Sequence, residues 1–334
     1  MDLLTQGILG AALAQSGSRK KETRLATVVG FLSGLLADSD ALIRSSSDSL
    51  LTIEYHRHFT HSIFFIPIGA LIAAFILWPF LKSKIEFRRL YWFALLGYSL
   101  SGFIDACTSY GTHLFWPLSD ERISFYLIAI VDPVFTIGLI IAVIVAAKKM
   151  KPRAALAGLL FAAFYLSISF IQSHRAQSTI EQIAIERGHV PEQLIAKPTM
   201  GNILLWRSTY KHDGRIYIDA VRTGLSARVY EGDSVQQFVI ERDLKSIVPG
   251  SVLYDDIKRF EKFSDGFIAI HPDNAQIIGD VRYSFQANGI KPLWGIDFVL
   301  EKPQQHAVYR MYHDYEKNDL KRFFAMLKDQ EVVR

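Results

Sequence analysis

The side chains best suited to chemistry gather in the short string HRHFTHS, which directly precedes a long apolar run. His58 and His61 are three residues apart and would share one face of a helix. His56 and His61 are five apart, so they would converge only if a helix starts between them, with Thr60 or the serine after His61 as its cap. Clustered imidazoles of this kind are typical ligands of a divalent metal.

Aspartates lie at the ends of the neighbouring apolar runs. Asp38 and Asp40 end one run, Asp105 ends another, and Asp132 precedes a proline inside a third. A charged side chain at membrane depth costs about 2.5–3.5 kcal/mol on insertion scales, so it usually has a partner or a function. Carboxylates near several histidines suit zinc first, with manganese or iron as alternatives. The simpler alternative is that Asp38 and Asp40 only end a helix or pair with Arg57.

Apolar helices must position these groups. Half of the 334 residues are hydrophobic, the mean hydropathy is +0.18, and nearly all long apolar runs lie in the first half. We predict an α-helical integral membrane bundle of about five to six apolar helices, because a span needs roughly 20 apolar residues. The predicted spans are Leu25–Ile43, Ile63–Leu81, Leu90–Thr108, Ile123–Ala147 and Ala154–Ile171, with Leu3–Ala14 as a sixth whose full crossing stays open.

Basic loops orient the predicted helices, because short cytoplasmic loops are enriched in Lys and Arg. The basic loops are Ser16–Arg24, Lys82–Arg89 and Lys148–Arg153. They alternate with the other connections, so we place them in the cytoplasm. The loops Arg44–Thr60 and Tyr110–Arg122, and everything after Gln172, then face the opposite side. The histidine string, the three aspartates that end apolar runs and His113 would all meet at that one membrane surface.

The second half of the sequence has a different pattern, in which polar and apolar residues alternate. We predict a transmembrane metal-site domain over 1–172, a partly helical linker over 173–201, and a small extracytoplasmic α+β domain over 202–334. Asp213-Gly214 lies between two strand-like runs and is a hairpin signal. The runs GFIAIH, AQIIGDVRYSF and LWGIDFVL also resemble strands, and LYDDIKRFEKF has helical spacing of its apolar residues. The net charge of only +4 argues against a nucleic-acid surface.

Five stretches, taken in order, resemble a known family. They are MDLLTQGILGAALAQ, ADSD, HRHFTHS, DACTSYGTHLFWP and VDPVFT. They are similar to the membrane-bound metal-dependent hydrolase family, of the LexA-regulated inner-membrane type in bacteria, over residues 1–172. The later FEKFSDGF and IIGDVRYSF are similar to longer members of that family.

The resemblance implies a bound divalent metal, hydrolysis and a bacterial inner membrane. Carried over position by position, it implies as ligands or ligand supporters Asp38, Asp40, His56, His61 and Asp105. Arg57, Thr60 and Thr108 fall in the same motifs. Shorter family members have a histidine near the N-terminus where this chain has Gln6, and His58 stands where a small residue is common. Gln6 and His58 are therefore additional candidates for the site.

We hypothesise a hydrolase at the outer membrane surface that acts on a lipid or lipid-linked phosphoester, since the site would lie at headgroup depth. A divalent ion lowers the pKa of bound water, to about 7 in zinc enzymes. Arg57 would neutralise an anionic substrate with its planar guanidinium, beside Thr60 and His113. A carboxylate that does not bind the metal, such as Asp40 or Asp105, would act as general base.

Two other functions remain open from the sequence. Buried acids and histidines also suit a transporter of protons or metal ions, and Asp132-Pro133 would break a predicted span as in such proteins. Against this, the polar groups gather at one face and do not line a path to the cytoplasm. The metal could instead stabilise a membrane anchor that presents a binding domain. The oligomeric state is not specified by the sequence.

Overall fold

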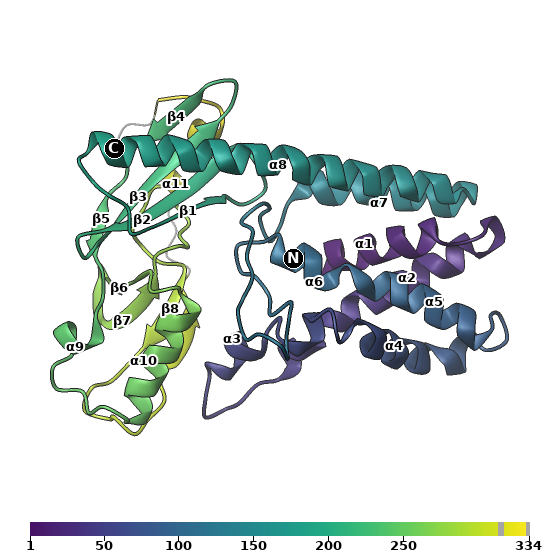
Figure 1. Cartoon of the computed structure of the whole chain (residues 1–334), viewed down its shortest axis with the longest axis horizontal. Helices are drawn as coiled ribbons and strands as arrows, with labels where there is room; N and C mark the ends of the chain where they lie inside the picture. Colours follow the sequence, from purple (N-terminus) through teal and green to yellow (C-terminus); the bar gives the residue numbers. More distant parts are fainter. Residues whose placement is uncertain (313–316, 332–334) are drawn as a thin grey trace. The chain divides into compact units, whose positions relative to one another are not determined.

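The computed structural model describes residues 1–312 and 317–331, and the chain forms two compact units (Figure 1). The first, which we call the helical unit, comprises Met1–Ile43, Tyr55–Phe170 and Met200–Asn202. The second, the β-rich unit, comprises Arg44–Glu54, Ile171–Thr199 and Ile203–Arg334. The segment between the ADSD and HRHFTHS motifs therefore belongs to the β-rich unit, while both motifs belong to the helical one.

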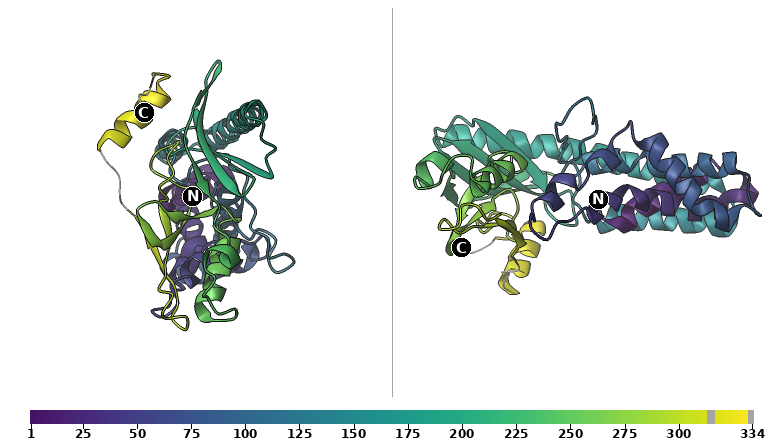
Figure 2. Two further views of the ribbon diagram at one scale, coloured as in Figure 1. Left: turned by 90° about the vertical axis from the view of Figure 1, so that its left-hand side faces the viewer. Right: turned by 90° about the horizontal axis from the view of Figure 1, so that it is seen from below.

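The helical unit is built from helices that run alongside one another (Figure 2). In chain order they are α1 (Leu3–Ser16), η1 (Lys20–Glu22), α2 (Thr23–Leu36), η2 (Ala37–Leu42), η3 (Phe59–His61), α4 (Ile66–Leu81), α5 (Phe87–Ser99), α6 (Ser101–Ala106), α7 (Pro133–Lys149) and the first part of α8 (Pro152–Glu186). Helix α1 packs against α2, α5 and α7, and α4 packs against α5.

Glycines allow three of these helices to touch backbone to backbone. A Cβ atom on Gly10 of α1 would lie 2.6 Å from the carbonyl oxygen of Gly30 in α2 and 2.5 Å from that of Gly97 in α5. Both distances are shorter than any side chain tolerates. Small residues serve this purpose in membrane helix bundles, where close approach replaces the hydrophobic effect as the source of packing energy. The close contact fixes the ends of α2 and α5, which lead into the candidate site.

Two helices in the described residues are long and apolar enough to cross a membrane, namely Lys20–Leu42 and Pro152–Glu186. A third candidate is the pair Leu51–His61 and Ile66–Leu81, which is bent by 90° at its break. The other helices are shorter: α1 has 14 residues, α5 has 13 and α7 has 17, against the roughly 20 that a bilayer core requires. The structure therefore supports a helical region with at least these membrane helices, and a count of five to six crossings stays a prediction.

The predicted span Ile123–Ala147 is wrong at its start, because α7 begins only at Pro133. Asp132 has extended backbone, and its side chain accepts a hydrogen bond from the Phe135 N–H at 3.1 Å. Proline at the first helical position has no N–H to leave unpaired and a suitable φ. Asp132-Pro133 therefore starts a helix with an aspartate cap and does not break one in mid-membrane.

The β-rich unit contains two antiparallel sheets. The first has the order β1 (Gln193–Pro198), β2 (Leu205–His212), β3 (Arg215–Thr223) and β4 (Ala227–Tyr230), with β5 (Ser234–Gln236) also paired to β3. The second has the order β6 (Ile268–His271), β7 (Asn274–Asp280), β8 (Trp294–Asp297) and β9 (Val308–Met311). The unit also contains α9 (Ile240–Asp243), α10 (Val252–Phe263) and α11 (Lys317–Leu327).

The predicted hairpin and the predicted amphipathic helix are both confirmed. Strands β2 and β3 pair from His212 and Arg215 onward, and the turn residues Asp213 and Gly214 both have positive φ, at 48° and 66°. Such a turn matches the twist of the two strands. In α10 the buried apolar residues include Leu253, Ile257 and Phe260, which recur at the spacing of one helix face.

The segment 173–201, expected to be a partly helical linker, holds regular structure throughout most of its length. Helix α8 continues to Glu186, and Ala176, Ile180 and Ala184 on it are fully buried at i, i+4 spacing. Strand β1 follows and pairs with β2, with Gln193 opposite Lys211. The short apolar run inside β1 gave no strand signal, because polar residues surround it.

The segment Arg44–Glu54 is part of the core of the β-rich unit, although the sequence indicates only a loop there. Leu50 is fully buried and Ile53 nearly so, in one cluster with Ile257 and Phe260 of α10. The Ser49 hydroxyl donates to the Ala307 carbonyl at 3.1 Å and accepts from the Tyr309 N–H at 2.8 Å. Short helix α3 (Leu51–Tyr55) begins within this segment.

Candidate metal centre

Asp38 and Asp40 project from the 3-10 helix η2, which continues α2 beyond Leu36. Aspartate is a poor residue for an α-helix interior, because its carboxylate competes for nearby backbone N–H groups. The tighter 3-10 turn forms there instead. Asp40 is only 2% exposed, so its negative charge lies inside the protein and requires partners.

His61 reaches the same place from η3, and a glycine makes that position accessible. A Cβ atom on Gly102 of α6 would lie 2.0 Å from the His61 carbonyl oxygen, so only glycine allows α6 to approach η3 this closely. The Ile63 N–H donates to the Leu114 carbonyl at 3.0 Å and holds the chain just after His61. His61 is 1% exposed and Asp105, on α6, is fully buried.

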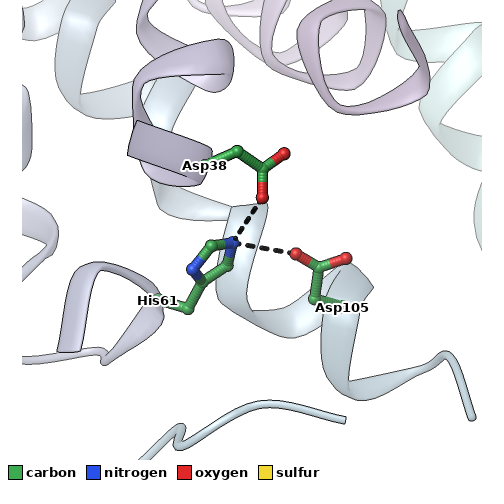
Figure 3. Close-up of side chains that lie close together, drawn as sticks. All are labelled: Asp38, His61 and Asp105. Atoms are coloured by element: carbon green, nitrogen blue, oxygen red, sulfur yellow. Dashed lines mark ion pairs between the residues drawn. The ribbon is translucent and has the colours of Figure 1, made fainter. Parts of the chain in front are cut away.

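Asp38, His61 and Asp105 form the centre of the site (Figure 3). The Nε2 atom of His61 lies 2.9 Å from Asp105 Oδ2 and 3.3 Å from Asp38 Oδ1. One ligand atom from each of the three residues fits within 4.8 Å of the others. Two ligands that are each roughly 2.1 Å from a tetrahedral ion lie roughly 3.4 Å apart. The observed spacing therefore suits three ligands of one ion.

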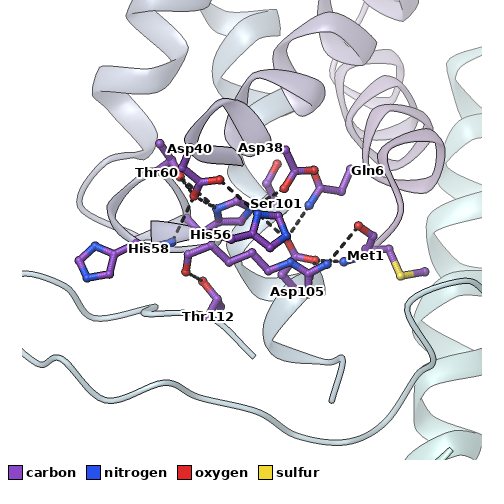
Figure 4. A network of polar contacts seen from close by, with 12 residues as sticks. Met1, Gln6, Asp38, Asp40, His56, His58, Thr60, Ser101, Asp105 and Thr112 are labelled. Carbon is purple, nitrogen blue, oxygen red and sulfur yellow. Dashed lines mark hydrogen bonds and ion pairs between the residues drawn. The ribbon is translucent and has the colours of Figure 1, made fainter. Parts of the chain in front are cut away.

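Asp40 holds the other side of the His61 ring. Its Oδ2 atom lies 3.3 Å from His61 Nδ1, accepts from the backbone N–H of His58 at 3.2 Å, and accepts from the hydroxyl of Thr60. Its Oδ1 atom lies 3.6 Å from His56 Nδ1. Figure 4 shows Asp40, His56 and Thr60 pointing toward one another. A carboxylate on the second nitrogen of a ligating histidine fixes its tautomer and orientation.

Asp105 has further polar partners besides His61. Gln6 donates to its Oδ2 atom at 2.5 Å, Arg57 Nη1 lies 3.4 Å from its Oδ1 atom, and the Met1 amino group also contacts Oδ1. Gln6 is 1% exposed. Three carboxylates, those of Asp38, Asp40 and Asp105, thus lie close together. If His61 is neutral, the positive charges of Arg57 and the Met1 amino group do not balance their three negative charges. Such a group needs either a bound cation or a protonated His61.

Arg57 is fixed in the site by an unusual backbone and several polar contacts. It is a non-glycine residue with a φ of 60°, which costs energy and is tolerated where the surroundings enforce it. Its Nη1 atom donates to Thr108 at 2.9 Å, its Nη2 atom donates to the Met1 carbonyl at 3.2 Å, and its guanidinium lies over the Tyr110 ring. The Thr112 hydroxyl donates to the Arg57 carbonyl at 2.9 Å.

The remaining candidates from the sequence lie at different distances from this centre. The rings of His58 and His113 lie 4.4 Å apart, centroid to centroid, with Trp116 beside His58 at 5.8 Å, and neither histidine contributes to the metal-type groups of the described residues. Thr108 accepts from Arg57, and its hydroxyl donates to the backbone carbonyl of Asp105 at 2.8 Å. Asp132 caps α7 and accepts from the Tyr165 hydroxyl at 2.7 Å, so its carboxylate already has partners of its own.

Several ligand-type atoms of the site are buried without a hydrogen-bond partner among the described residues. In the described part of the chain, four buried ligand atoms of this site find no hydrogen-bond partner, namely Asp38 Oδ1, Asp40 Oδ1, His56 Nδ1 and His61 Nε2. Buried polar atoms are nearly always paired, so each such exception needs a reason. A divalent ion is one group that can satisfy atoms of this kind. The donor set of imidazole and carboxylate matches zinc, manganese or iron.

A further group of metal-type side chains lies in the β-rich unit and has a different explanation. Asp48, Asp256 and His306 lie close enough to share an ion. Arg259, however, already pairs with Asp48 at 3.0 Å and with Asp256 at 2.7 Å, and it binds Glu54 with two hydrogen bonds. The guanidinium therefore supplies the positive charge, and we interpret the group as an ion-pair network.

Sequence reasoning missed two residues that shape the site. Gly102 permits the approach of α6 to η3, and the Tyr98 hydroxyl donates to the Thr60 carbonyl at 2.7 Å. Neither stands out in the sequence, because a glycine or a tyrosine inside an apolar run gives no signal of its contacts. Their roles depend on which helices pack together.

These features define a helical membrane protein with a buried polar site and a β-rich C-terminal domain. A family model described as YdjM inner membrane protein matches residues 1–176 of the 334. The chain belongs to the YdjM inner membrane protein family. No curated protein and no solved structure matches the chain.

Proposed function

We propose that the chain is a membrane-embedded, metal-dependent hydrolase that acts on a lipid or lipid-linked phosphoester at the outer surface of the inner membrane. The observation that supports it is the convergence of Asp38, His61 and Asp105, whose ligand atoms lie within 4.8 Å of one another. Inner membrane residence follows from the family. Hydrolysis, the metal and the substrate are the parts that we add.

The residues that would hold the ion are His61, Asp38 and Asp105, with Asp40 orienting the imidazole. Zinc fits this donor set best, with manganese or iron as alternatives. When bound, such an ion supplies Lewis acidity, which makes water nucleophilic near neutral pH and polarises the bond that is cleaved. Gln6 donates to Asp105 at 2.5 Å and would keep that carboxylate oriented toward the ion.

Other side chains of the site would bind the substrate and move a proton. The Arg57 guanidinium is fixed beside Asp105 and can donate to phosphate oxygens in a planar, bidentate way. Asp40, the cluster carboxylate that is not among these three ligands, would accept the proton that water loses. Thr60 donates its hydroxyl to Asp40, so it supports the base, and His113 with His58 would form an aromatic wall beside the substrate.

The topology is also part of this proposal. The alternation of basic loops supports about five to six crossings, with the C-terminal domain outside the cytoplasm. Short helices such as α1 would then cross a locally thinned bilayer or enter it only in part. In this topology the ends of α2 and α6 and the start of α4 meet at the outer surface, at the depth of lipid headgroups.

A phosphoesterase assay on purified full-length protein tests the proposal. We expect lipid phosphate ester to be hydrolysed, the activity to disappear with a chelator, and zinc or manganese to restore it. Arg57→Ala should keep the metal and lose activity by roughly 10²–10³-fold, the usual cost of removing one donor to a developing charge. Arg88→Ala is the matched control, since it removes an exposed arginine on α5 that is not part of the site. Arg57→Ala with wild-type turnover would contradict the proposed role, and a chelator-resistant activity would contradict the metal.

A further inference from the structure

We propose that the site binds two divalent ions, with Asp38 shared between them; this rests on the proposed function, because it needs a metal at His61. The inner ion would be held by Asp38, His61 and Asp105. The outer ion would be held by Asp38, Asp40 and His56. This identifies the site with the two-ion arrangement that suits in-line displacement at a phosphoester.

The structure contains two overlapping sets of ligand atoms. In each set the three ligand atoms lie within 4.8 Å of one another, and Asp38 belongs to both sets. A carboxylate with two oxygens can bridge two ions, whereas a histidine nitrogen cannot. Asp38 comes from η2, as Asp40 does, and is the one residue that both sets have in common. The sharing therefore follows from the chemistry of the side chain as well as from its position.

Asp40 divides its two oxygens between different tasks. Oδ2 faces His61 Nδ1 at 3.3 Å and also accepts from Thr60 and from the His58 backbone. Oδ1 makes none of these hydrogen bonds and faces His56 Nδ1 at 3.6 Å. That spacing is close to the roughly 3.4 Å expected of two ligands on one tetrahedral ion. Asp40 can thus orient the ligand of the inner ion and bind the outer ion at the same time.

The unpaired atoms divide equally between the two positions. Asp38 Oδ1 and His61 Nε2 belong to the inner set, and Asp40 Oδ1 and His56 Nδ1 belong to the outer set; the described structure gives none of the four a hydrogen-bond partner. One ion at the inner position would satisfy the first pair only. Asp40 is 2% exposed, so leaving its oxygen unpaired is costly. A second ion explains the second pair.

The two positions differ in their access to solvent. The His61 side chain is 0% exposed, whereas the His56 side chain is 28% exposed. His56 packs edge-on against Tyr110, at 5.4 Å between ring centroids, which keeps its ring near Asp40. The outer ion would therefore meet the substrate and exchange more readily. With two divalent ions and Arg57, the total positive charge would exceed the negative charge of the three carboxylates. This excess favours an anionic phosphate substrate.

Manganese titration of metal-free, full-length protein in detergent tests this inference. We expect wild type to bind two Mn²⁺ per chain, with an electron paramagnetic resonance spectrum that shows exchange coupling between them. His56→Ala should bind one Mn²⁺ with an uncoupled spectrum. His58→Ala is the matched control: it is a neighbouring histidine outside both ligand sets, and it should retain two coupled ions.

The outcomes separate this inference from the proposed function. A wild-type protein that saturates at one Mn²⁺ overturns the second ion and leaves the proposed hydrolase intact, whereas no binding overturns both. Retention of two coupled ions in His56→Ala also overturns the assignment. His56→Gln, which preserves size and polarity without a ring nitrogen, provides a second variant, and the wild-type stoichiometry decides the question if both variants misfold.

Discussion

The Nε2 atom of His61 lies 2.9 Å from a carboxylate oxygen of Asp105. The two residues come from different helices, since η3 precedes α4 in the sequence and α6 follows α5. This relationship depends on the close approach of α6 to η3, which Gly102 permits. The ligand pair is therefore a product of helix packing.

Substitution of Gly102 should weaken metal binding without removing any ligand. In Gly102→Ala the new methyl group would collide with the His61 carbonyl oxygen, which lies 2.0 Å from the ideal Cβ position. His61 or α6 must then move, and a metal site tolerates displacements of only about 0.5 Å. We expect the Kd for zinc, measured by competition with a chelating dye, to rise at least tenfold. Ser101→Ala changes the preceding residue without adding atoms, and an equal effect there would contradict the explanation.

Leu50 should stabilise the β-rich unit, although it lies far in sequence from the rest of that unit. It is fully buried against α10 and its neighbours, so Leu50→Ala should lower the free energy of unfolding by about 2–5 kcal/mol. Calorimetry of the detergent-solubilised chain measures this as a lower melting temperature of the β-rich unit. Leu225→Ala is the control, because Leu225 is fully exposed. No difference between the two variants would show that Arg44–Glu54 does not belong to that core.

Buried Lys197 predicts a specific pH dependence of the β-rich unit. Burial, with a smaller contribution from Arg207, holds the pKa of the Lys197 ammonium well below its usual value. The unfolded chain then binds more protons, so stability rises with pH between the lowered pKa and about 10.4, the unfolded value. Below the lowered pKa, the loss of stability that comes from burying the charged ammonium is fully present. Lys197→Met should flatten the rise of the melting temperature with pH. An unchanged slope of melting temperature against pH would contradict the assignment of this rise to Lys197.

The side of the membrane on which the β-rich unit lies can be tested with cysteine labelling. Cys107 is the only cysteine and is buried, so background labelling should be low. Ser226→Cys, at an exposed position, should react with a membrane-impermeant thiol reagent in spheroplasts. Lys84→Cys, in a loop predicted to be cytoplasmic, should react only after lysis. The reverse pattern would overturn the outer-surface location of the site.

Local patterns predicted a good part of this structure. Asp213-Gly214 indicated the β2–β3 hairpin because both positions need positive φ, and the apolar spacing in Val252–Phe263 indicated α10. The histidine string and the aspartates named the residues that the structure brings together around His61. In particular, η3 begins at Phe59, between His56 and His61, and both rings face Asp40.

What the sequence did not reveal depends on distant contacts. Membership of Arg44–Glu54 in the β-rich core depends on Ala307, Tyr309 and α10, which follow much later in the chain. The start of α7 at Pro133 was hidden inside an apolar run, where apolar character alone does not distinguish helix from extended chain. The division of ligand atoms between two positions requires the actual directions of the side chains.

Metal content of the purified full-length protein tests the central claim most directly. Wild type, His61→Ala, Asp105→Ala and the control His212→Ala would be compared by elemental analysis after identical purification. His212 belongs to β2 and to none of the ligand groups in the described residues. The account predicts bound zinc or manganese in wild type and His212→Ala, and a sharp loss in both site variants, because each of these variants removes one of the three ligand atoms of the inner set. Full metal occupancy in His61→Ala and Asp105→Ala would contradict it.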